Sequence, residues 1–438
     1  MKKIAFHNLG CKVNAYETEA MLQQMESRGY QVVPFEEKAD AYVVNTCSVT
    51  NMADRKSRQM LHRARKRNPE ALVVAVGCYA QADPDRVLAD GAVDLVVGND
   101  QKGRLAELIE ARTSSLVEIG AVREYEELRV ADSQEHTRAF LKIQDGCNQF
   151  CSYCLIPYLR GRVRSRRPEE VVAEARRLAE KGFREVVLTG IHLSSYGQRP
   201  DASQGPGAGQ GAGAAAPDIL REEAGEPLLH LIQELSGVEG IARIRLGSLE
   251  PRIVTEHFAE ALAANPKICP HFHLSLQSGC NATLGRMNRH YTTGEYYEKC
   301  QLLRRVFAHP AITTDVIVGF PGETEEEFEE TCRFLEQVRF YETHVFKYSR
   351  RKGTRADRMP DQVPEEVKAR RSSVLLAMTE RHSAEFRQYY RGRQEEILLE
   401  QEVTVQGQRM YEGYTREYVK GFVPAEGHRP GELALAEL

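Results

Sequence analysis

Short apolar runs alternate with amphipathic stretches in the first part of the chain. The apolar runs are residues 4–6, 42–44, 72–76 and 95–97. The stretches between them repeat apolar residues at helical spacing, so they predict helices between strands. Strands that alternate with helices are typical of a parallel sheet. Residues 1–113 are therefore predicted to form a doubly wound α/β domain.

A second series of this kind predicts strands over residues 139–143, 185–188, 241–246, 271–276, 312–318 and 344–346. Helical patterns follow at residues 168–181, 228–235, 254–264, 294–307 and 323–338. Six such units are fewer than a closed eight-stranded barrel requires. We therefore expect a partial, six-stranded (β/α) barrel within residues 136–370, with its active site at the carboxyl ends of the strands.

The last part of the chain changes to short strands at residues 397–401, 410–420 and 432–435, which predict a small β-barrel. A helical pattern over residues 372–390 precedes it, so residues 373–438 are expected to form a third domain with a linking helix. Residues 198–227 contain a Gly/Ala-rich tract, which cannot bury enough apolar surface to order itself. We expect a flexible insertion there, in the loop after the second barrel strand.

Composition narrows the classes of function. The net charge of −4 excludes a globally basic protein, so an RNA site must be a local patch. Basic residues gather at residues 160–167, 55–67 and 347–358, and these three runs are the candidate RNA contacts. The chain has no apolar run of about 18 residues and no apolar signal region, so we expect a cytoplasmic protein without a membrane partner. Ten cysteines in that compartment indicate metal or redox chemistry before disulfides.

Three cysteines directly follow the first predicted barrel strand. Cys147, Cys151 and Cys154 lie within the stretch CNQFCSYC. A structural zinc site needs four protein ligands, whereas this loop offers three thiols and no histidine. An iron–sulfur cube held by three thiolates keeps one iron open for another ligand. The spacing favours such a cluster, and three unrelated buried thiols are the alternative.

Three more cysteines follow strands of the predicted N-terminal domain. Cys11, Cys47 and Cys78 come after the runs at residues 4–6, 42–44 and 72–76. In an open α/β sheet, ligands bind in the crevice at the carboxyl ends of the strands, so cysteines distant in sequence can converge there. From position alone, three buried thiols without a ligand remain the alternative.

Longer stretches around these cysteines resemble a known family. The loop CNQFCSYC, with QDG before it and LIPYLRGR after it, resembles the cluster loop of radical S-adenosylmethionine (SAM) enzymes, in particular the tRNA methylthiotransferases. The stretches NLGCKVN, NTCSVT and GCYAQ resemble the cysteine motifs in the N-terminal domain of that family. The stretch EGYT at residues 412–415 resembles its RNA-binding TRAM domain.

This resemblance implies two 4Fe–4S clusters and SAM as cofactors. One cluster would be held by Cys11, Cys47 and Cys78 and the other, which binds SAM, by Cys147, Cys151 and Cys154. The candidate SAM contacts are Tyr153, which matches the superfamily pattern, and three residues at predicted strand ends: Gly190, Ser248 and Gln277. No catalytic residue is expected beyond the cluster ligands.

Within the family, the stretches around Cys147 and Arg160 most resemble the branch that acts on N6-threonylcarbamoyladenosine beside the anticodon of tRNA. The implied reaction forms the 2-methylthio derivative at the adenine C2–H bond, which has no acidic proton and needs cofactor radical chemistry. The implied partners are the anticodon stem-loop, an electron donor such as flavodoxin and a sulfur source. Alternatives are methylthiolation of isopentenyl-adenosine tRNA or of a ribosomal protein, and a non-catalytic metal-holding RNA-binding protein.

Overall fold

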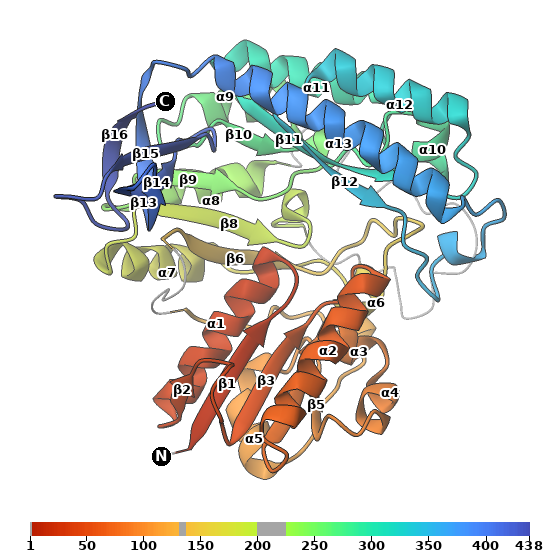
Figure 1. The fold of residues 1–438 in the computed structure, drawn as a ribbon, viewed down its shortest axis with the longest axis vertical. Helices are drawn as coiled ribbons and strands as arrows, with labels where there is room; N and C mark the ends of the chain where they lie inside the picture. Colours follow the sequence, from red (N-terminus) through yellow and green to blue (C-terminus); the bar gives the residue numbers. More distant parts are fainter. Residues whose placement is uncertain (1, 131–136, 199–224) are drawn as a thin grey trace.

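The chain forms three structural units, which follow one another along the sequence (Figure 1). The computed structural model describes residues 2–130, 137–198 and 225–438. Most of the predicted insertion, residues 199–224, lies outside the described residues. None of the described helices is long and apolar enough to span a membrane.

The N-terminal unit is a parallel sheet of five strands in the order β2-β1-β3-β4-β5. The strands are β1 (Lys3–Asn8), β2 (Gln31–Val33), β3 (Ala41–Thr46), β4 (Leu72–Gly77) and β5 (Leu95–Val97). Helices α1 (Lys12–Ser27) and α5 (Leu105–Ala111) cover one face, and α2 (Asn51–Arg67), α3 (Cys78–Ala82) and α4 (Pro84–Ala89) cover the other. Helices on both faces of a parallel sheet confirm the doubly wound prediction. Of the five strands in this sheet, the apolar runs of the sequence failed to predict the short edge strand β2.

The central unit contains six parallel strands that curve into an open barrel (Figure 1). They are β6 (Ala139–Asp145), β8 (Glu185–Gly190), β9 (Arg243–Leu246), β10 (His271–His273), β11 (Ala311–Val318) and β12 (Glu342–Lys347). A two-residue strand, β7 (Arg164–Ser165), pairs antiparallel with β6. Isolated bridges from Ile244 to Ile268 and from Leu249 to Leu274 join the β6–β9 sheet to the β10–β12 sheet. The predicted partial barrel of six strands is therefore confirmed.

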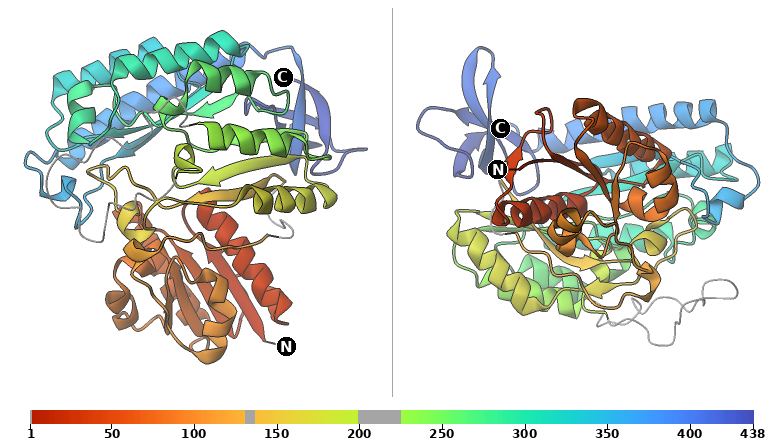
Figure 2. Two further views of the ribbon diagram at one scale, coloured as in Figure 1. Left: turned by 180° about the vertical axis from the view of Figure 1, so that it is seen from behind. Right: turned by 90° about the horizontal axis from the view of Figure 1, so that it is seen from below.

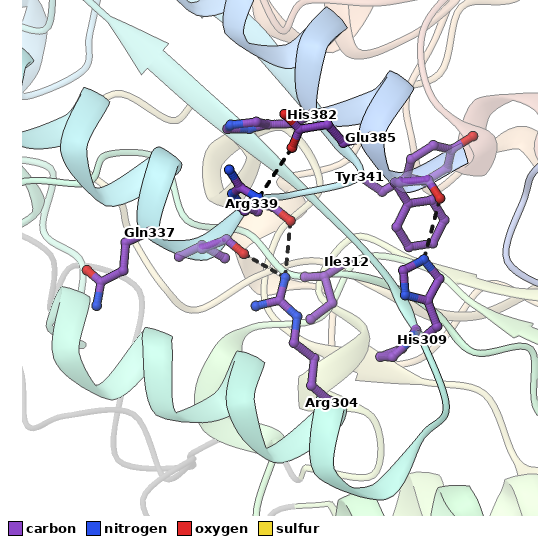
Figure 3. A pocket seen from close by; sticks show the side chains of 11 residues that line it. Arg304, His309, Ile312, Gln337, Arg339, Tyr341, His382 and Glu385 are labelled. Atoms are coloured by element: carbon purple, nitrogen blue, oxygen red, sulfur yellow. Dashed lines mark hydrogen bonds and ion pairs between the residues drawn. The ribbon is translucent and has the colours of Figure 1, made fainter. Parts of the chain in front are cut away.

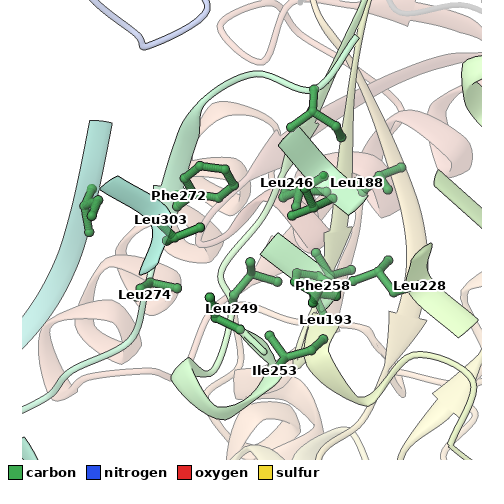
Figure 4. Packing of buried hydrophobic residues seen from close by; sticks show 14 of the residues in the cluster. Leu188, Leu193, Leu228, Leu246, Leu249, Ile253, Phe258, Phe272, Leu274 and Leu303 are labelled. Carbon is green, nitrogen blue, oxygen red and sulfur yellow. The ribbon is translucent and has the colours of Figure 1, made fainter. Parts of the chain in front are cut away.

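Helices cover the outside of this barrel. They are α7 (Pro168–Glu180), α8 (Glu226–Ser236), α9 (Glu256–Ala263), α10 (Asn281–Arg286), α11 (Thr293–Val306), α12 (Glu325–Val338) and α13 (Glu365–Gln388). Figure 4 shows the core between strands and helices, where Leu188 and Leu246 pack with Leu228 and Phe258. Capping boxes begin α11 and α12, because a threonine and a glutamate exchange hydrogen bonds in the first turn of each.

The C-terminal unit is a four-stranded antiparallel sheet. Its strands β13 (Gln394–Val405), β14 (Gln408–Tyr414), β15 (Lys420–Pro424) and β16 (Leu433–Glu437) are ordered β15-β14-β13-β16. The sheet curls so far that a Cβ atom on Gly421 of β15 would lie 3.4 Å from the Cβ of Ala436 on β16. The Arg243 guanidinium, at the start of β9, donates to the carbonyls of Tyr414 and Glu396. This sheet therefore sits at the amino ends of the barrel strands, as Figure 1 shows.

A buried ion cluster joins the N-terminal unit to the barrel. Arg160 donates to both carboxylate oxygens of Glu17 on α1, at 2.8 and 2.9 Å, and also contacts Asp145 at the end of β6 at 3.1 Å. Lys102 and Lys142 reach the same Glu17 carboxylate. All five side chains are buried. Figure 2 shows the two units meeting along α1 and β6.

Glu17→Gln is expected to weaken this interface strongly. The substitution leaves three buried cations with one carboxylate, and breaking a buried ion pair by removing one partner costs about 3–5 kcal/mol. We expect the melting temperature of the full-length protein to fall by several degrees in a thermal scan. Glu402→Gln is the matched control, because Glu402 and its partner Arg409 are both exposed, and it should leave the melting temperature unchanged. Equal melting temperatures for the two variants would contradict the assigned role of Glu17.

Candidate active site: two cysteine triads at strand ends

The cysteine loop at residues 147–154 begins at the carboxyl end of β6. Gly146, just before it, has a φ angle of +70°, and a Cβ atom there would lie 1.9 Å from the carbonyl oxygen of Arg162. Glycine is thus required where the loop starts, because the backbone there lies directly against the backbone of residues 161 and 162. The Cys147 amide also donates to the Gly161 carbonyl at 3.1 Å, which closes the loop at its base.

Hydrogen-bond donors point at each sulfur of this loop. The amides of Gln149 and Ile156 lie 3.4 Å from the sulfurs of Cys147 and Cys154, respectively. The Arg289 guanidinium lies 3.3 Å from Cys151 Sγ. Donors of this kind stabilise thiolate ligands and tune iron–sulfur clusters.

The three thiols are close enough to influence one another. Burial, followed by the charge of the neighbouring Cys151, raises the pKa of Cys147 to about 12. Burial, followed by the charges of Cys151 and Cys147, also raises the pKa of Cys154. A bound metal must therefore displace protons from these sulfurs, as metal binding to thiols generally does.

The second triad lies at the carboxyl ends of β1, β3 and β4, in the crevice where sequence reasoning expected it. Burial raises the pKa of Cys47 to about 11, and both Cys78 and Cys11 contribute to the shift, so the three thiols are neighbours. A Cβ atom on Gly10 would lie 3.0 Å from Cys47 Sγ, so this site also needs a glycine beside it. The Asn99 amide lies 3.7 Å from Cys78 Sγ.

The spacing of the sulfurs discriminates between a single ion and a cluster. Thiolates around one tetrahedral zinc lie about 3.8 Å apart, since each Zn–S bond is about 2.3 Å. In neither triad do all three sulfurs lie within 4.8 Å of one another. Neither triad therefore has the spacing of three ligands on one ion. A cluster with one open iron takes three thiolates, which is the ligand set that each triad offers.

The N-terminal triad lies close to the barrel unit. Lys12 follows Cys11, and its pKa is lowered to about 8 by burial and by the charges of Arg245 and Arg138, which belong to barrel strands or their approaches. Lys12, beside Cys11, therefore lies within the electrostatic influence of barrel residues. We call the space enclosed by the barrel strands and bordered by the N-terminal unit the chamber. A groove of about 900 Å³ on the N-terminal unit also reaches Cys11, and Asn8, Leu22 and Pro34 are among its lining residues.

The four predicted SAM contacts lie near the cysteine loop or at strand ends. Tyr153 belongs to the loop itself and packs edge-on against Phe320, with ring centroids 6.2 Å apart. Gly190 ends β8, and Ser248 follows β9 and is exposed. Gln277 has a φ angle of +73°, and its amide donates to the Asp315 carbonyl at 2.8 Å. Contact of these residues with SAM stays a prediction.

Several site residues were missed by sequence reasoning. Asn288 donates to the carbonyl of Phe150 at 3.1 Å, and Arg289 contacts Cys151, so the segment after α10 holds the cysteine loop. Nearby, buried side-chain atoms of His192, Glu250 and Arg252 have no hydrogen-bond partner among the described residues. Burial, then Arg289 and Arg252, lower the pKa of His192 to about 3, so its imidazole is neutral. No local spacing marks Asn288, Arg289 or Arg252, because the fold brings them to the site from elsewhere in the chain. His192 and Glu250, in contrast, follow predicted strand ends.

Three of the five arginines in the basic run at residues 160–167 are unavailable to RNA. Arg160, Arg164 and Arg166 are buried and paired with carboxylates. Their positive charge is used inside the protein, so it cannot contact phosphates. The other two runs are mostly exposed and lie side by side, since buried Arg351 pairs with Asp54 at the start of α2.

A further cavity lies outside the barrel, on the helical layer. It measures about 460 Å³ and is lined by α11, α12 and α13 (Figure 3). Arg304 in this cavity donates to the carbonyls of Val338 and Arg339 at the end of α12, and Arg339 pairs with Glu385. These groups satisfy one another and fix helix ends, so the cavity is separate from the chemistry of the triads.

Comparison with known families places both cysteine regions in recognised domains. A family model described as uncharacterized protein family UPF0004 matches residues 3–98, and the radical SAM superfamily model matches residues 141–335. Among solved structures, the radical SAM methyltransferase TsrM from Kitasatospora setae has a TM-score of 0.56 at 15% identity, covering 79% of this chain and 73% of that chain. This likeness shows the shared fold.

Curated relatives are similar over most of the chain. The threonylcarbamoyladenosine tRNA methylthiotransferase MtaB of Bacillus subtilis is 41% identical over 96% of this chain and 90% of its own length. The enzyme of the same name from Aquifex aeolicus is 40% identical over 91% and 93%. A tRNA-2-methylthio-N(6)-dimethylallyladenosine synthase from Pelotomaculum thermopropionicum is 35% identical over 92% and 87%. With this coverage and both cysteine triads in place, the chain belongs to the radical SAM tRNA methylthiotransferase family.

Proposed function

We propose that this protein converts N6-threonylcarbamoyladenosine in tRNA to its 2-methylthio derivative, at the position beside the anticodon. The observation that carries the proposal is the pair of cysteine triads at the carboxyl ends of strands in two neighbouring units, each of which offers three sulfurs. The names of the relatives at 41% and 40% identity support this modified base as the substrate. The second candidate for the substrate is dimethylallyladenosine, also called isopentenyl-adenosine, because the relative at 35% identity is named for the 2-methylthio derivative of that base.

Each triad is assigned one 4Fe–4S cluster. Cys147, Cys151 and Cys154 would hold the cluster that binds SAM, and Cys11, Cys47 and Cys78 would hold the second. When bound, these cofactors supply the radical and sulfur chemistry that a C–H bond without an acidic proton requires.

The protein's own residues orient these groups and exclude water. Arg289 places a positive charge beside the Cys151 thiolate, and Asn288 fixes the backbone of the loop. Tyr153, held by Phe320, would line the SAM site together with Gly190, Ser248 and Gln277. Cys47, Cys78 and Cys147 are buried, and burial at these positions would keep solvent from reactive species, which is a general requirement of radical enzymes.

Exposed basic residues beside the second triad supply a surface for RNA. The ridge consists of α2 and the loop at residues 349–358, which carry the exposed residues Arg55, Lys56, Lys352 and Arg355. The exposed apolar side chains of Val49, Met52 and Phe346 border it. Phosphate contacts on this ridge would position the anticodon stem-loop, while apolar groups near the chamber would contact unstacked bases.

The reaction also needs electrons and sulfur. A low-potential electron donor such as flavodoxin would reduce the SAM-binding cluster, and a separate sulfur source would reload the second cluster. The groove that reaches Cys11 would give the sulfur source a path to the second triad. The proposed place of action is the cytoplasm, where tRNA is modified.

Anaerobic reconstitution is expected to give about eight irons per chain, since each cubane cluster contains four. Changing Cys147, Cys151 and Cys154 together to alanine should lower the count to about four, and changing the other triad should do the same. Iron and labile sulfide analysis checks both variants. If the intact protein instead held about four irons and the variant without Cys147, Cys151 and Cys154 held none, the N-terminal triad would bind no cluster.

Nucleoside mass spectrometry tests the substrate. A strain that lacks the endogenous enzyme and expresses this protein should accumulate 2-methylthio-N6-threonylcarbamoyladenosine in its tRNA. Cys11→Ala should abolish the product, because the second cluster loses a ligand, whereas Cys332→Ala, at a partly exposed cysteine on α12, should leave it unchanged. Methylthiolation of isopentenyl-adenosine instead would favour the second candidate.

Salt dependence of RNA binding tests the basic ridge. Removing two phosphate contacts with the double variant Lys56→Ala and Lys352→Ala should reduce the slope of log K against log salt by roughly 1.5, since each contact contributes about 0.7–0.9. The control is Arg176→Ala with Lys181→Ala, two exposed basic residues at α7. Fluorescence anisotropy with a labelled anticodon stem-loop measures the slope. An unchanged slope in the first variant, or an equal loss in the control, would exclude the ridge as the RNA site.

A further inference from the structure

Two histidines and an aspartate meet on three neighbouring barrel strands. His273 ends β10, Asp315 lies within β11, and His344 lies within β12. In the strand register Asp315 pairs with His344, and His273 pairs with Thr313, two residues before Asp315. One nitrogen or oxygen atom from each of the three lies within 4.8 Å of the others. Among the described residues, no other group of three such side chains meets this condition.

The alternation of side chains places this group inside the barrel. Thr314, next to Asp315, bonds to the Tyr296 hydroxyl of helix α11, so it faces the outer helical layer. Phe272 and Leu274, on both sides of His273, belong to the core under the helices. Since neighbouring residues of a strand point to opposite faces, Asp315 and His273 point into the chamber.

The distances suit ligands of one tetrahedral ion. His273 Nε2 lies 3.2 Å from Asp315 Oδ2. Two ligand atoms bound at about 2.0–2.1 Å in a tetrahedral zinc site lie roughly 3.3 Å apart. The rings of His273 and His344 have centroids 5.6 Å apart, and two imidazoles on one tetrahedral zinc place theirs about 5 Å apart.

Thr313 fixes the orientation of the His273 ring. Its hydroxyl lies 3.0 Å from His273 Nδ1. A hydrogen bond at this nitrogen leaves Nε2, on the side of Asp315, to bind a metal, which is how metal-binding histidines are commonly oriented. Thr313 itself is buried, so this contact is held in place by the sheet.

We propose that His273, Asp315 and His344 bind one divalent first-row cation, of the zinc or ferrous type, in the chamber wall. Imidazole and carboxylate ligands suit these ions, and three protein ligands leave a coordination position open. Asp315 and His344 are partly exposed to the chamber, so an ion has a path to the site. The site uses no cysteine and is distinct from both triads. A simple histidine–aspartate ion pair is the rival interpretation.

Zinc analysis of the iron–sulfur holoprotein tests the site. Protein reconstituted to its full iron content is dialysed anaerobically against micromolar Zn²⁺, and zinc and iron are measured together by mass spectrometry. We expect about one zinc per chain at unchanged iron. His344→Ala and Asp315→Asn should each lose this zinc, whereas Thr313→Val should weaken its binding by roughly 10–100-fold.

His257→Ala is the matched control. His257 is exposed and pairs with the Glu226 carboxylate, but it belongs to no group of three described side chains whose ligand atoms lie within 4.8 Å of one another. This variant should retain the zinc. Equal iron content and melting temperature establish that each variant is folded, and exposed His344 can be removed without opening the core. The proposal is overturned if the wild-type holoprotein takes up no zinc, or if His344→Ala binds as much as the wild type.

Discussion

The contact of Arg160 with Glu17 and Asp145 fixes the arrangement of the two halves of the active site. Glu17 lies on α1, which begins directly after Cys11, and Asp145 ends β6, just before the loop of Cys147. The bidentate contact between guanidinium and carboxylate restricts both distance and orientation. Removing these charges from water costs several kcal/mol per ion, and only well-aligned pairing offsets that cost. The ion cluster therefore holds α1 and the end of β6 in one relative position, and with them Cys11 and the loop of Cys147.

The charges of this cluster are not balanced within it. Three cations, Lys102, Lys142 and Arg160, face two carboxylates, which leaves one positive charge in the interior. Burial opposes charge on Arg160, but Glu17, Asp145 and then Cys78 favour it, so its pKa lies well above the usual value. Cys78 is thus close enough to supply the missing anion. Burial raises the pKa of the neighbouring Cys47 and so favours its protonated thiol. Cluster ligation would make the three cysteines thiolates, so loading the N-terminal triad would also complete the charge balance of the interface.

Sequence reasoning predicted the elements better than their contacts. The strands were found because buried parallel strands are continuous apolar runs. Cys11, Cys47 and Cys78 followed from the carboxyl-end rule, and Cys147, Cys151 and Cys154 followed from their spacing on one loop. Arg289 and Asn288 were missed because their partners, Cys151 and Phe150, are far away in the sequence. The buried arginines Arg160, Arg164 and Arg166 were wrongly taken as RNA contacts for a related reason. A run of arginines looks alike whether its carboxylate partners come from solvent-exposed neighbours or, like Glu17, from another domain.

The same limit applies to the proposed RNA surface, which neither basic run forms alone. Helix α2 belongs to the N-terminal unit, and the loop at residues 349–358 follows the last barrel strand. Arg351 joins them, because its guanidinium donates to Ser48, Asn51 and Asp54. Ser48 is adjacent to Cys47, so the contact that assembles the ridge also borders the second triad. Docking of the N-terminal unit therefore builds the chamber and the surface beside it in one step, and a change that loosens the buried ion cluster would disturb both together.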